Sequence, residues 1–397
     1  MGKRGSGEGT IFQRKDNRWV GRISLGRDGN GKRQQKTVYG LTQGEVIAKL
    51  DDLKQKAKLN AKGIIGKDSL AGYLGRWLSN EVAVNKAAKT YEEYESATRL
   101  HIVPFVGHIK LNKLTGEHLQ DWQAEQCRKG YSANQRARSI RVLRNALNSA
   151  IRLNLIPNNP MIAVSKPKVV RREVTPLEPE KCFALFDACK ANRLGEVVTL
   201  AIMTGMRLRE IFALDWDAVN LSEGVLTVRK SIEEITKKTM VATGRKGTLN
   251  EKPPKTRAGK RVITLEPIAV QALKDRLTKA NSEGFTPAEV PVVFPDTIGG
   301  RLRSSNFNKQ CWNPIRESLG IRDVKFHDLR HTQASLMLYA GVDLKVIQSR
   351  LGHADFGTTA NLYAHLMQDS QADATGKLSS MMQAAKPADE KASEYIR

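Results

Sequence analysis

Polar side chains in the C-terminal half of the chain form a set that could carry out chemistry on a phosphate diester. Arg207 follows a Thr-Gly turn, where one apolar helix is expected to end and another to begin. His327 and Arg330 are three residues apart, which places both on one face of a helix. His353 follows a glycine that is expected to cap a short helix, and Tyr363 lies ten residues further on.

Each of these residue types has a specific use at a phosphate. Two guanidinium groups can each donate a pair of hydrogen bonds to the non-bridging oxygens of the phosphate. A tyrosine hydroxyl can attack the phosphorus and form a covalent phosphotyrosine. Histidines can orient oxygens and transfer protons, and a lysine can protonate the departing alkoxide. Because no pair of carboxylates accompanies these motifs, we expect cationic side chains instead of metal ions to neutralise the phosphate. No cofactor is expected.

Four strings of residues resemble the motifs of the tyrosine recombinases, or phage integrases. They are TGMRLREI, HDLRHTQASL, LGHADFGTT and NLYAH, and they follow that family's order and spacing. The resemblance implies that Arg207 and Arg330 bind the phosphate, that His327 and His353 are the two active-site histidines, and that Tyr363 is the nucleophile. It implies a DNA strand-transferase that needs neither metal nor ATP.

The same resemblance implies a general-acid lysine in a β-hairpin, before a threonine or small residue and a basic strand. Lys255, in the string PKTRAGKRVITL, fits this pattern best, and Lys252 and Lys260 remain alternatives. Glu210 lies one helical turn after Arg207. We expect its carboxylate to hold a guanidinium group in place and not to act as a base.

Composition favours a partner that is a polyanion. The chain has 65 Lys and Arg against 41 Asp and Glu, a net charge of +24, which is typical of nucleic-acid-binding proteins. A merely solvated or ribosomal basic surface is the alternative. No run of 18 apolar residues and no apolar signal core occurs, so we expect a cytoplasmic protein without membrane spans. The four cysteines are scattered without a CxxC pair, which fits a reducing compartment and predicts no zinc site.

Residues 1–62 are predicted to form a small sheet and one helix that bind DNA. Residues 18–25 alternate with period two, and the sequence DGNG at 28–31 is typical of a hairpin turn before a returning strand at 34–39. A capping box at 42–45 then begins an amphipathic helix. Ten basic residues against three acids occupy residues 1–40, and we expect an outward basic face on the sheet, formed by Arg18, Arg22 and Lys36. By resemblance this is the arm-binding domain of the larger phage and conjugative-element integrases.

Residues 68–165 are predicted to be all-helical, and by resemblance they are the core-binding domain. The spacing places helices after Thr90, Thr115 and Ser132. The last and longest of these carries five arginines without an acid, of which the candidates for phosphate contact are Arg138, Arg141 and Arg144. Residues 166–176 are basic and punctuated by proline, which predicts a linker.

Residues 177–375 are predicted to be the catalytic domain, mainly helical with a β-hairpin region. Expected helices lie near 178–191, 195–204, 207–214, 267–279, 306–318, 328–340 and 343–350. Strands are expected at 225–229 and 261–265, joined by a long mobile hairpin. Residues 376–397 show little pattern of helix or strand, and we expect this tail to contact a neighbouring protomer. The fold class is therefore multidomain α+β.

These features predict a site-specific recombinase that acts as a homotetramer on double-stranded DNA at core and arm-type sites. Integration or excision of a phage or other mobile element is the expected role, with a DNA-bending host factor and a directionality factor as further partners. The alternatives are a type IB topoisomerase-like enzyme, with the same chemistry but no synapsis, and a catalytically silent DNA-binding accessory factor.

Overall fold

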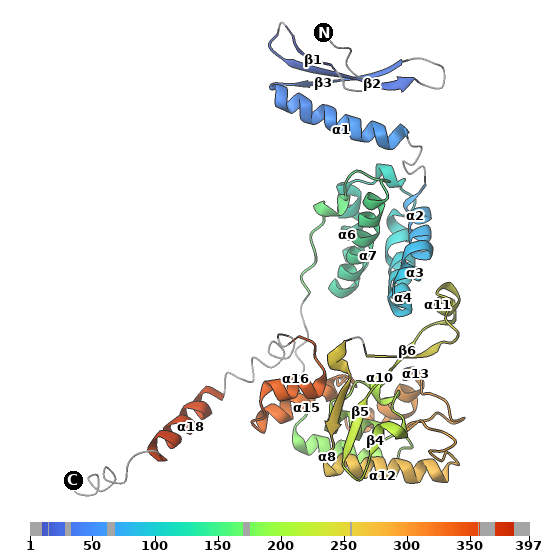
Figure 1. Cartoon of the computed structure of the whole chain (residues 1–397), viewed down its shortest axis with the longest axis vertical. Coiled ribbons are helices and arrows are strands. Elements are labelled where there is room, and N and C mark those ends of the chain that lie inside the picture. Colours follow the sequence, from blue (N-terminus) through green and yellow to red (C-terminus); the bar gives the residue numbers. More distant parts are fainter. Residues whose placement is uncertain are drawn as a thin grey trace, which may run out of the picture. The chain divides into compact units, whose positions relative to one another are not determined.

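The structure is a computed structural model that describes residues 10–14, 16–27, 33–61, 68–169, 175–254, 256–355, 357 and 370–384. These residues form a multidomain α+β protein in which helices predominate (Figure 1). The chain divides into two compact units: residues 1–171 with 236–245, and residues 172–235 with 246–397. Within the described ranges, no helix is long and apolar enough to cross a membrane.

The first unit begins with a three-stranded antiparallel sheet of order β1-β2-β3, followed by a helix. Their bounds are Thr10–Gln13 for β1, Trp19–Arg27 for β2, Arg33–Gly40 for β3 and Gln43–Ala61 for α1. The predicted combination of a sheet and one helix is confirmed, and the predicted turn at 28–31 lies outside the described residues.

Alternation along β2 decides which residues face α1. Ile23 forms a buried cluster with Val46 and Leu50 of the helix. Gly21 lies on the same face of the sheet, because a Cβ at this position would approach Val46 Cγ1 and Leu50 Cδ1 to 2.7 Å. The helix therefore packs directly on the backbone of the central strand.

The strand register corrects the expected place of Lys36. Arg22 pairs with Thr37, and Ile23 pairs with Lys36. Because directly paired residues of antiparallel strands point to the same face, Lys36 lies on the face that packs against α1. The prediction that Lys36 shares the outward face with Arg22 is wrong. On that outward face, the Arg22 guanidinium lies 5.5 Å from the centroid of the Phe12 ring.

Residues 68–165 are helical, as predicted. The longer helices are α2 (Leu70–Trp77), α4 (Ala88–Ala97), α6 (Gly116–Arg128) and α7 (Ala133–Arg152). Shorter segments join them: η1 (Leu78–Val82), α3 (Ala83–Asn85), η2 (Thr98–Ile102), α5 (Val103–Val106), η3 (Leu111–Lys113) and η4 (Pro160–Ala163). Their apolar faces form one core that includes Leu74, Trp122 and Leu143.

Most of the predicted helix starts in the first unit are confirmed. The hydroxyls of Thr42, Thr115 and Ser132 each accept a hydrogen bond from the backbone N–H three residues later. The prediction that Thr90 begins a helix is wrong, since α4 begins at Ala88 without a side-chain cap. The alanines before Thr90 favour helix, so the helix starts earlier than the capping pattern indicates.

A segment from the second half of the sequence belongs to the first unit. Residues 236–245 contain helix α11 (Lys237–Ala242), which packs against α4. The backbone N–H of Thr236 donates to Glu92 Oε2 at 2.8 Å, and Lys238 Nζ donates to Glu95 Oε1 at 2.5 Å. The long hairpin predicted here thus contains a helix that its polar sequence does not reveal.

The second unit is a mainly helical domain with two small antiparallel sheets. Strands β4 (Val219–Asn220), β5 (Val225–Val228) and β8 (Arg261–Thr264) form one sheet in the order β4-β5-β8. Strands β6 (Ser231–Glu234) and β7 (Leu249–Lys252) form the other. The two predicted strands therefore correspond to β5 and β8, which are hydrogen-bonded neighbours.

The helices of the second unit follow the predicted order. They are α8 (Pro179–Lys190), α9 (Glu196–Thr204), α10 (Leu208–Ile211), α12 (Pro267–Ser282), α13 (Ser304–Phe307), α14 (Asn313–Ser318), α15 (Asp328–Tyr339) and α16 (Leu344–Leu351). Three short segments complete them: η5 (Trp216–Ala218), η6 (Arg257–Gly259) and η7 (Asn308–Trp312). Helix α9 lies in the centre of the core and contacts α8, α10, α12 and α15.

Two expectations for this unit are corrected. Helix α10 ends at Ile211, so the helix predicted for 207–214 is a single turn. Residues Ser370–Ala384 form helix α18, whereas the sequence after 375 was expected to have little structure. Alanine, leucine, methionine and glutamine favour helix even without a strong amphipathic pattern. Leu378, Met381 and Met382 of this helix are exposed.

Candidate active site

Arg207 is placed by the junction between two helices. Helix α9 ends at Thr204 and is capped by Gly205, whose φ of 64° is in the left-handed region. The chain then turns, and Arg207 becomes the N-cap residue of α10. A side chain at Gly205 would meet Leu351 Cδ2 at 2.7 Å and Gln333 Oε1 at 2.8 Å, so this turn is packed against α15 and α16. The side chain of Arg207 remains 40% exposed.

Glu210 holds the Arg207 guanidinium, as predicted. Its Oε1 accepts from Arg207 Nη1 at 2.7 Å, and its Oε2 accepts from the Arg207 backbone N–H at 3.0 Å. Its Oε2 also accepts from Arg261 Nη2 at 2.9 Å. Burial raises the pKa of Glu210, but the charges of Arg261 and Arg207 outweigh burial, and the pKa is lowered overall. The buried carboxylate is therefore ionised and shared by two guanidinium groups.

Arg330 is positioned by backbone carbonyls. Arg330 is 3% exposed. Its Nη1 donates to the Gly205 carbonyl and its Nη2 donates to the Leu351 carbonyl, both at 2.6 Å. Gly205 belongs to the turn before Arg207, and Leu351 is the last residue of α16. One side chain thus joins three segments that are far apart in the sequence. The two bonds to the carbonyls therefore fix the orientation of the guanidinium group.

His353 follows α16 at its glycine cap. Gly352 has a φ of 69°, and the backbone N–H of His353 donates to the Gln348 carbonyl at 3.2 Å. Burial lowers the pKa of His353 to about 4, and the positive charges of Arg330 and Arg207 act in the same direction. Arg330 is bonded to the Leu351 carbonyl, two residues before this imidazole, which is neutral at pH 7.

His327 is the N-cap residue of α15, one helical turn before Arg330. Although part of the residue is open to solvent, its ring packs edge-to-face on that of His331, with centroids 5.3 Å apart. Burial lowers the pKa of His327 to about 4, and His331, Arg330 and Arg207 contribute in the same direction. The structure therefore brings together four of the predicted residues: two arginines and two neutral histidines.

Comparisons with known proteins agree with this site. Residues 176–369 match the phage integrase family, and residues 70–125 match the N-terminal SAM-like domain of phage integrases. The chain belongs to the phage integrase family of tyrosine recombinases. Every segment that contributes to the site lies within the first of these matches.

Similar proteins extend over nearly the whole chain. A XerC-like tyrosine recombinase of Caldanaerobacter subterraneus is 26% identical over 381 residues, which cover 90% of this chain and 95% of the relative. An integrase of Saccharopolyspora erythraea is 24% identical and covers 94% of this chain and 96% of its own length.

Solved structures of integrases share the fold. The Tn1549 transposon integrase in complex with a circular intermediate DNA superposes with a TM-score of 0.64 at 18% identity, covering 78% of this chain and 99% of the integrase. A lambda integrase dimer bound to a core site superposes with a TM-score of 0.54 at 16% identity, covering 91% and 96%.

Two residues that the family resemblance implies, Lys255 and Tyr363, lie outside the described residues. The two alternative lysines are described. Lys252 Nζ donates to Glu233 Oε1 at 2.6 Å across the β6–β7 hairpin, and this carboxylate is buried. Lys260 is exposed next to Arg261, which is buried on the opposite side of the strand. Lys252 is therefore held by an ion pair, whereas Lys260 is open to solvent.

The candidate DNA-binding arginines of α7 differ from one another. Arg138 and Arg141 are exposed, as a phosphate contact requires. Arg144 is half-buried, and its Nη2 donates to the carbonyls of Met161 and Val164, both at 3.2 Å. Arg144 therefore has a structural role in holding the end of the helical domain.

Sequence reasoning missed Arg261, although a signal was present. Along β8, Arg261 and Ile263 are buried, while Val262 and Thr264 are exposed. A basic residue at an inward-facing strand position requires an internal partner. That partner is Glu210, which the sequence did not connect with this strand.

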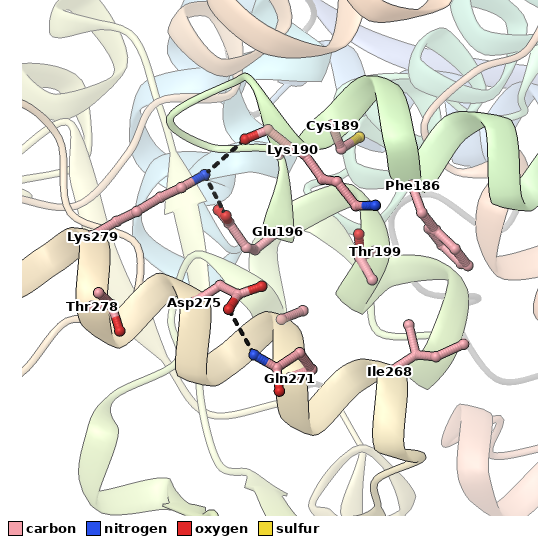
Figure 2. A pocket seen from close by; sticks show the side chains of 12 residues that line it. Phe186, Cys189, Lys190, Glu196, Thr199, Ile268, Gln271, Asp275, Thr278 and Lys279 are labelled. Atoms are coloured by element: carbon pink, nitrogen blue, oxygen red, sulfur yellow. Dashed lines mark hydrogen bonds and ion pairs between the residues drawn. The ribbon is translucent and has the colours of Figure 1, made fainter.

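A separate cavity of about 460 Å³ lies between α8, α9 and α12. Figure 2 shows that Lys279 donates there to the Lys190 carbonyl and the Glu196 carboxylate, and that Gln271 donates to Asp275. None of the predicted site residues lines this cavity. This cavity is therefore separate from the cluster of arginines and histidines.

Proposed function

We propose that this tyrosine recombinase is the integrase of a phage or another mobile element. It cuts and rejoins double-stranded DNA at specific sites through a covalent 3′-phosphotyrosine intermediate. The observation that carries the proposal is the convergence of Arg207, Arg330, His327 and His353. Arg330 is bonded to the turn before Arg207 and to the helix end before His353, and it lies one helical turn after His327. Such a cluster of donors suits an anionic phosphate.

The reaction follows from the chemistry of these groups. Arg207 and Arg330 bind the non-bridging oxygens of the scissile phosphate. The hydroxyl of Tyr363 loses its proton to a neutral histidine while its oxygen attacks the phosphorus. The bond from phosphorus to the 5′ oxygen then breaks, and Lys255 supplies the proton to that oxygen. Attack by the 5′ hydroxyl of a partner strand reverses these bond changes, so we expect neither ATP nor a metal ion to be needed.

The number of donors matches the energy required. A free phenol has a pKa near 10, so ionising it at pH 7 costs about 4 kcal/mol. One donor directed at the developing charge typically contributes about 2.7–4 kcal/mol. Two arginines and one histidine therefore offset this cost and leave a surplus for the pentacoordinate transition state.

The neighbouring regions have roles in binding DNA. We assign the core site to the helical region 68–165 and arm-type sites to residues 1–62, joined by a linker at 166–176 to the catalytic domain at 177–375. A lambda integrase tetramer has been solved on a Holliday junction, which supports a homotetramer here. The exposed apolar residues of α18 suit a contact between protomers in this tetramer. We expect a DNA-bending host factor and a directionality factor as further partners, in the cytoplasm of a bacterial host.

A nicked suicide substrate that carries a core site tests the nucleophile. Wild-type protein should become covalently attached to the DNA, and Tyr363→Phe should bind equally well without attachment, because only one oxygen is removed. An adduct formed by the Phe variant would assign the nucleophile elsewhere. No adduct with wild-type protein would favour a silent accessory factor.

Strand exchange separates recombination from topoisomerase chemistry. Two duplexes labelled with different dyes and carrying the same site should yield products with both labels. Relaxation of supercoiled DNA without joined products would instead indicate a type IB topoisomerase-like enzyme.

A further inference from the structure

We infer that Arg261 is a positioning residue that fixes three catalytic segments relative to one another. This inference rests on the proposed function of Arg207, His353 and the lysine in the β7–β8 turn. Arg261 begins β8, and its side chain is 5% exposed. It lies in the basic strand that follows Lys255 in the string PKTRAGKRVITL, and the sequence prediction gave it no role.

Each nitrogen of the Arg261 guanidinium contacts a different segment. Its Nη2 donates at 2.9 Å to Glu210 Oε2, on the carboxylate that holds Arg207. Its Nε donates at 2.6 Å to the Arg350 carbonyl, three residues before His353. Its Nη1 donates at 3.1 Å to the Gly259 carbonyl, in the turn that follows Lys255. A single planar group is thus bonded to the segments of three proposed active-site residues.

Only an arginine can make these contacts together. A guanidinium group directs N–H donors outward in one plane at fixed angles, whereas a lysine ammonium is a single point with three donors. The three acceptors are a carboxylate and two carbonyls that belong to different turns. Arg261→Lys would preserve the charge beside Glu210 but could not span the three segments.

Gly352 provides an independent indication that this contact is tight. A Cβ there would lie 2.8 Å from the Ala258 carbonyl oxygen and 3.1 Å from Arg261 Nη1. Its φ of 69° also strains any other residue. The turn that carries His353 therefore approaches the Arg261 guanidinium as closely as the backbone allows.

The shared carboxylate explains how Arg261 affects the phosphate. Glu210 must fix Arg207, but a carboxylate paired with Arg207 alone would neutralise the charge that the phosphate needs. A second guanidinium on Glu210 leaves net positive charge in the cluster while the geometry stays fixed. Loss of Arg261 should therefore misplace Arg207 without removing it.

The test compares rates of covalent attachment to a suicide substrate at saturating DNA. We expect Arg261→Lys to react about 10- to 100-fold more slowly, because small misplacements of catalytic groups cost about this much. DNA affinity should stay within about 3-fold of wild type. The matched control is Arg276→Lys, since Arg276 is fully buried and paired with Glu283 in the same unit but contacts no proposed active-site segment. This control should lower the melting temperature and leave the rate within about 3-fold of wild type.

A double variant distinguishes positioning from general destabilisation. If Arg261 acts through Arg207, adding Arg261→Lys to Arg207→Lys should slow attachment by less than about 3-fold further, because the interaction is already lost. Full multiplication of the two effects would overturn the inference. Gly352→Ala, which keeps Arg261 but crowds its Nη1, should slow attachment about 10-fold even if Arg261→Lys fails to fold.

Wild-type protein and Tyr363→Phe in the same assay separate the proposed function from the role of Arg261. If wild-type protein forms no adduct, the proposed function is overturned together with this inference. If wild-type protein reacts and Arg261→Lys or Gly352→Ala reacts at the same rate, only the role of Arg261 is overturned.

Discussion

The arginines of the catalytic cluster and those of helix α7 are held in opposite ways. Arg207, Arg261 and Arg330 are bonded to a buried carboxylate and to backbone carbonyls, and two of the three are almost fully buried. Arg138 and Arg141 of α7 are exposed to solvent. Both regions are basic, and both are proposed to contact phosphate groups.

The difference reflects what each region must do. Stabilising a transition state requires donors that are already in place, since reorganisation during the reaction would cost part of the gain. Binding the DNA backbone requires positive charge near phosphates and tolerates side chains that adjust. Substitutions that keep charge should therefore be harmful in the catalytic cluster and mild on α7.

The largest effect is expected for Arg207→Lys. This variant keeps the charge but loses the planar pair of donors, so attachment to a suicide substrate should slow by about 100-fold or more while DNA affinity changes little. Rapid quenching at saturating DNA measures the rate. Arg209→Lys, two residues away, is the matched control and should react normally. A loss confined to affinity would place Arg207 with the α7 arginines.

A smaller effect is expected for Arg138→Ala and Arg141→Ala. Each should weaken binding several-fold and reduce the slope of log affinity against log salt by about 1, because one phosphate contact is lost. Titrations over a range of salt concentrations measure both quantities. Arg152→Ala on the same helix, where Arg152 pairs with Glu81, should leave the slope unchanged. An unchanged slope for all three variants would remove α7 from the DNA interface.

A still smaller effect should separate the two faces of the N-terminal sheet. Arg22→Ala removes a charge from the outward face and should weaken protection of arm-type sites a few-fold in footprinting of the full-length chain. Lys36→Ala, on the face toward α1, should leave this protection nearly unchanged. The same comparison tests Arg18→Ala, which should resemble Arg22→Ala. Equal losses for Arg22 and Lys36 would indicate a non-specific basic arm.

The smallest effect concerns the dependence of stability on pH. Burial and the neighbouring arginines lower the pKa of His353 to about 4 in the folded protein. An unfolded histidine has a pKa near 6.5, so between these values the unfolded chain binds the proton more tightly. His353 therefore makes its full contribution to the free energy of unfolding above pH 6.5, and this contribution is lost as the pH falls toward 4. Denaturant unfolding of wild type and His353→Gln should show a flatter pH dependence for the variant, and parallel curves would contradict the lowered pKa.

The sequence predicted the parts of the site that depend on local pattern. The junction at Gly205 and Arg207, the helical spacing of His327 and Arg330, and the glycine cap before His353 are all present. These features are encoded within a few neighbouring residues. The prediction that Glu210 holds a guanidinium group depended on one helical turn and is also confirmed.

The contacts that fix these parts together could not be predicted in the same way. The bond from Arg261 to Glu210 joins residues 51 positions apart, and the bonds from Arg330 reach Gly205 and Leu351. Such contacts depend on how α9, α15, α16 and β8 pack. The place of Lys36 was missed for a related reason, because it depends on the pairing register of β2 and β3.

Helix α11 has a consequence for how the polypeptide can be divided. Residues 236–245 belong to the first unit, where they pack with α4, but the residues on both sides of them belong to the second unit. The chain therefore passes between the two units three times. Cleavage in the linker at 166–176 would leave two pieces still associated through the bonds of Thr236 and Lys238 to Glu92 and Glu95. A fragment that starts at 172 would carry α11 without the helix on which it packs. The first unit is therefore not a continuous stretch of the sequence, and a domain exchange must replace residues 236–245 together with the helix α4 on which they pack.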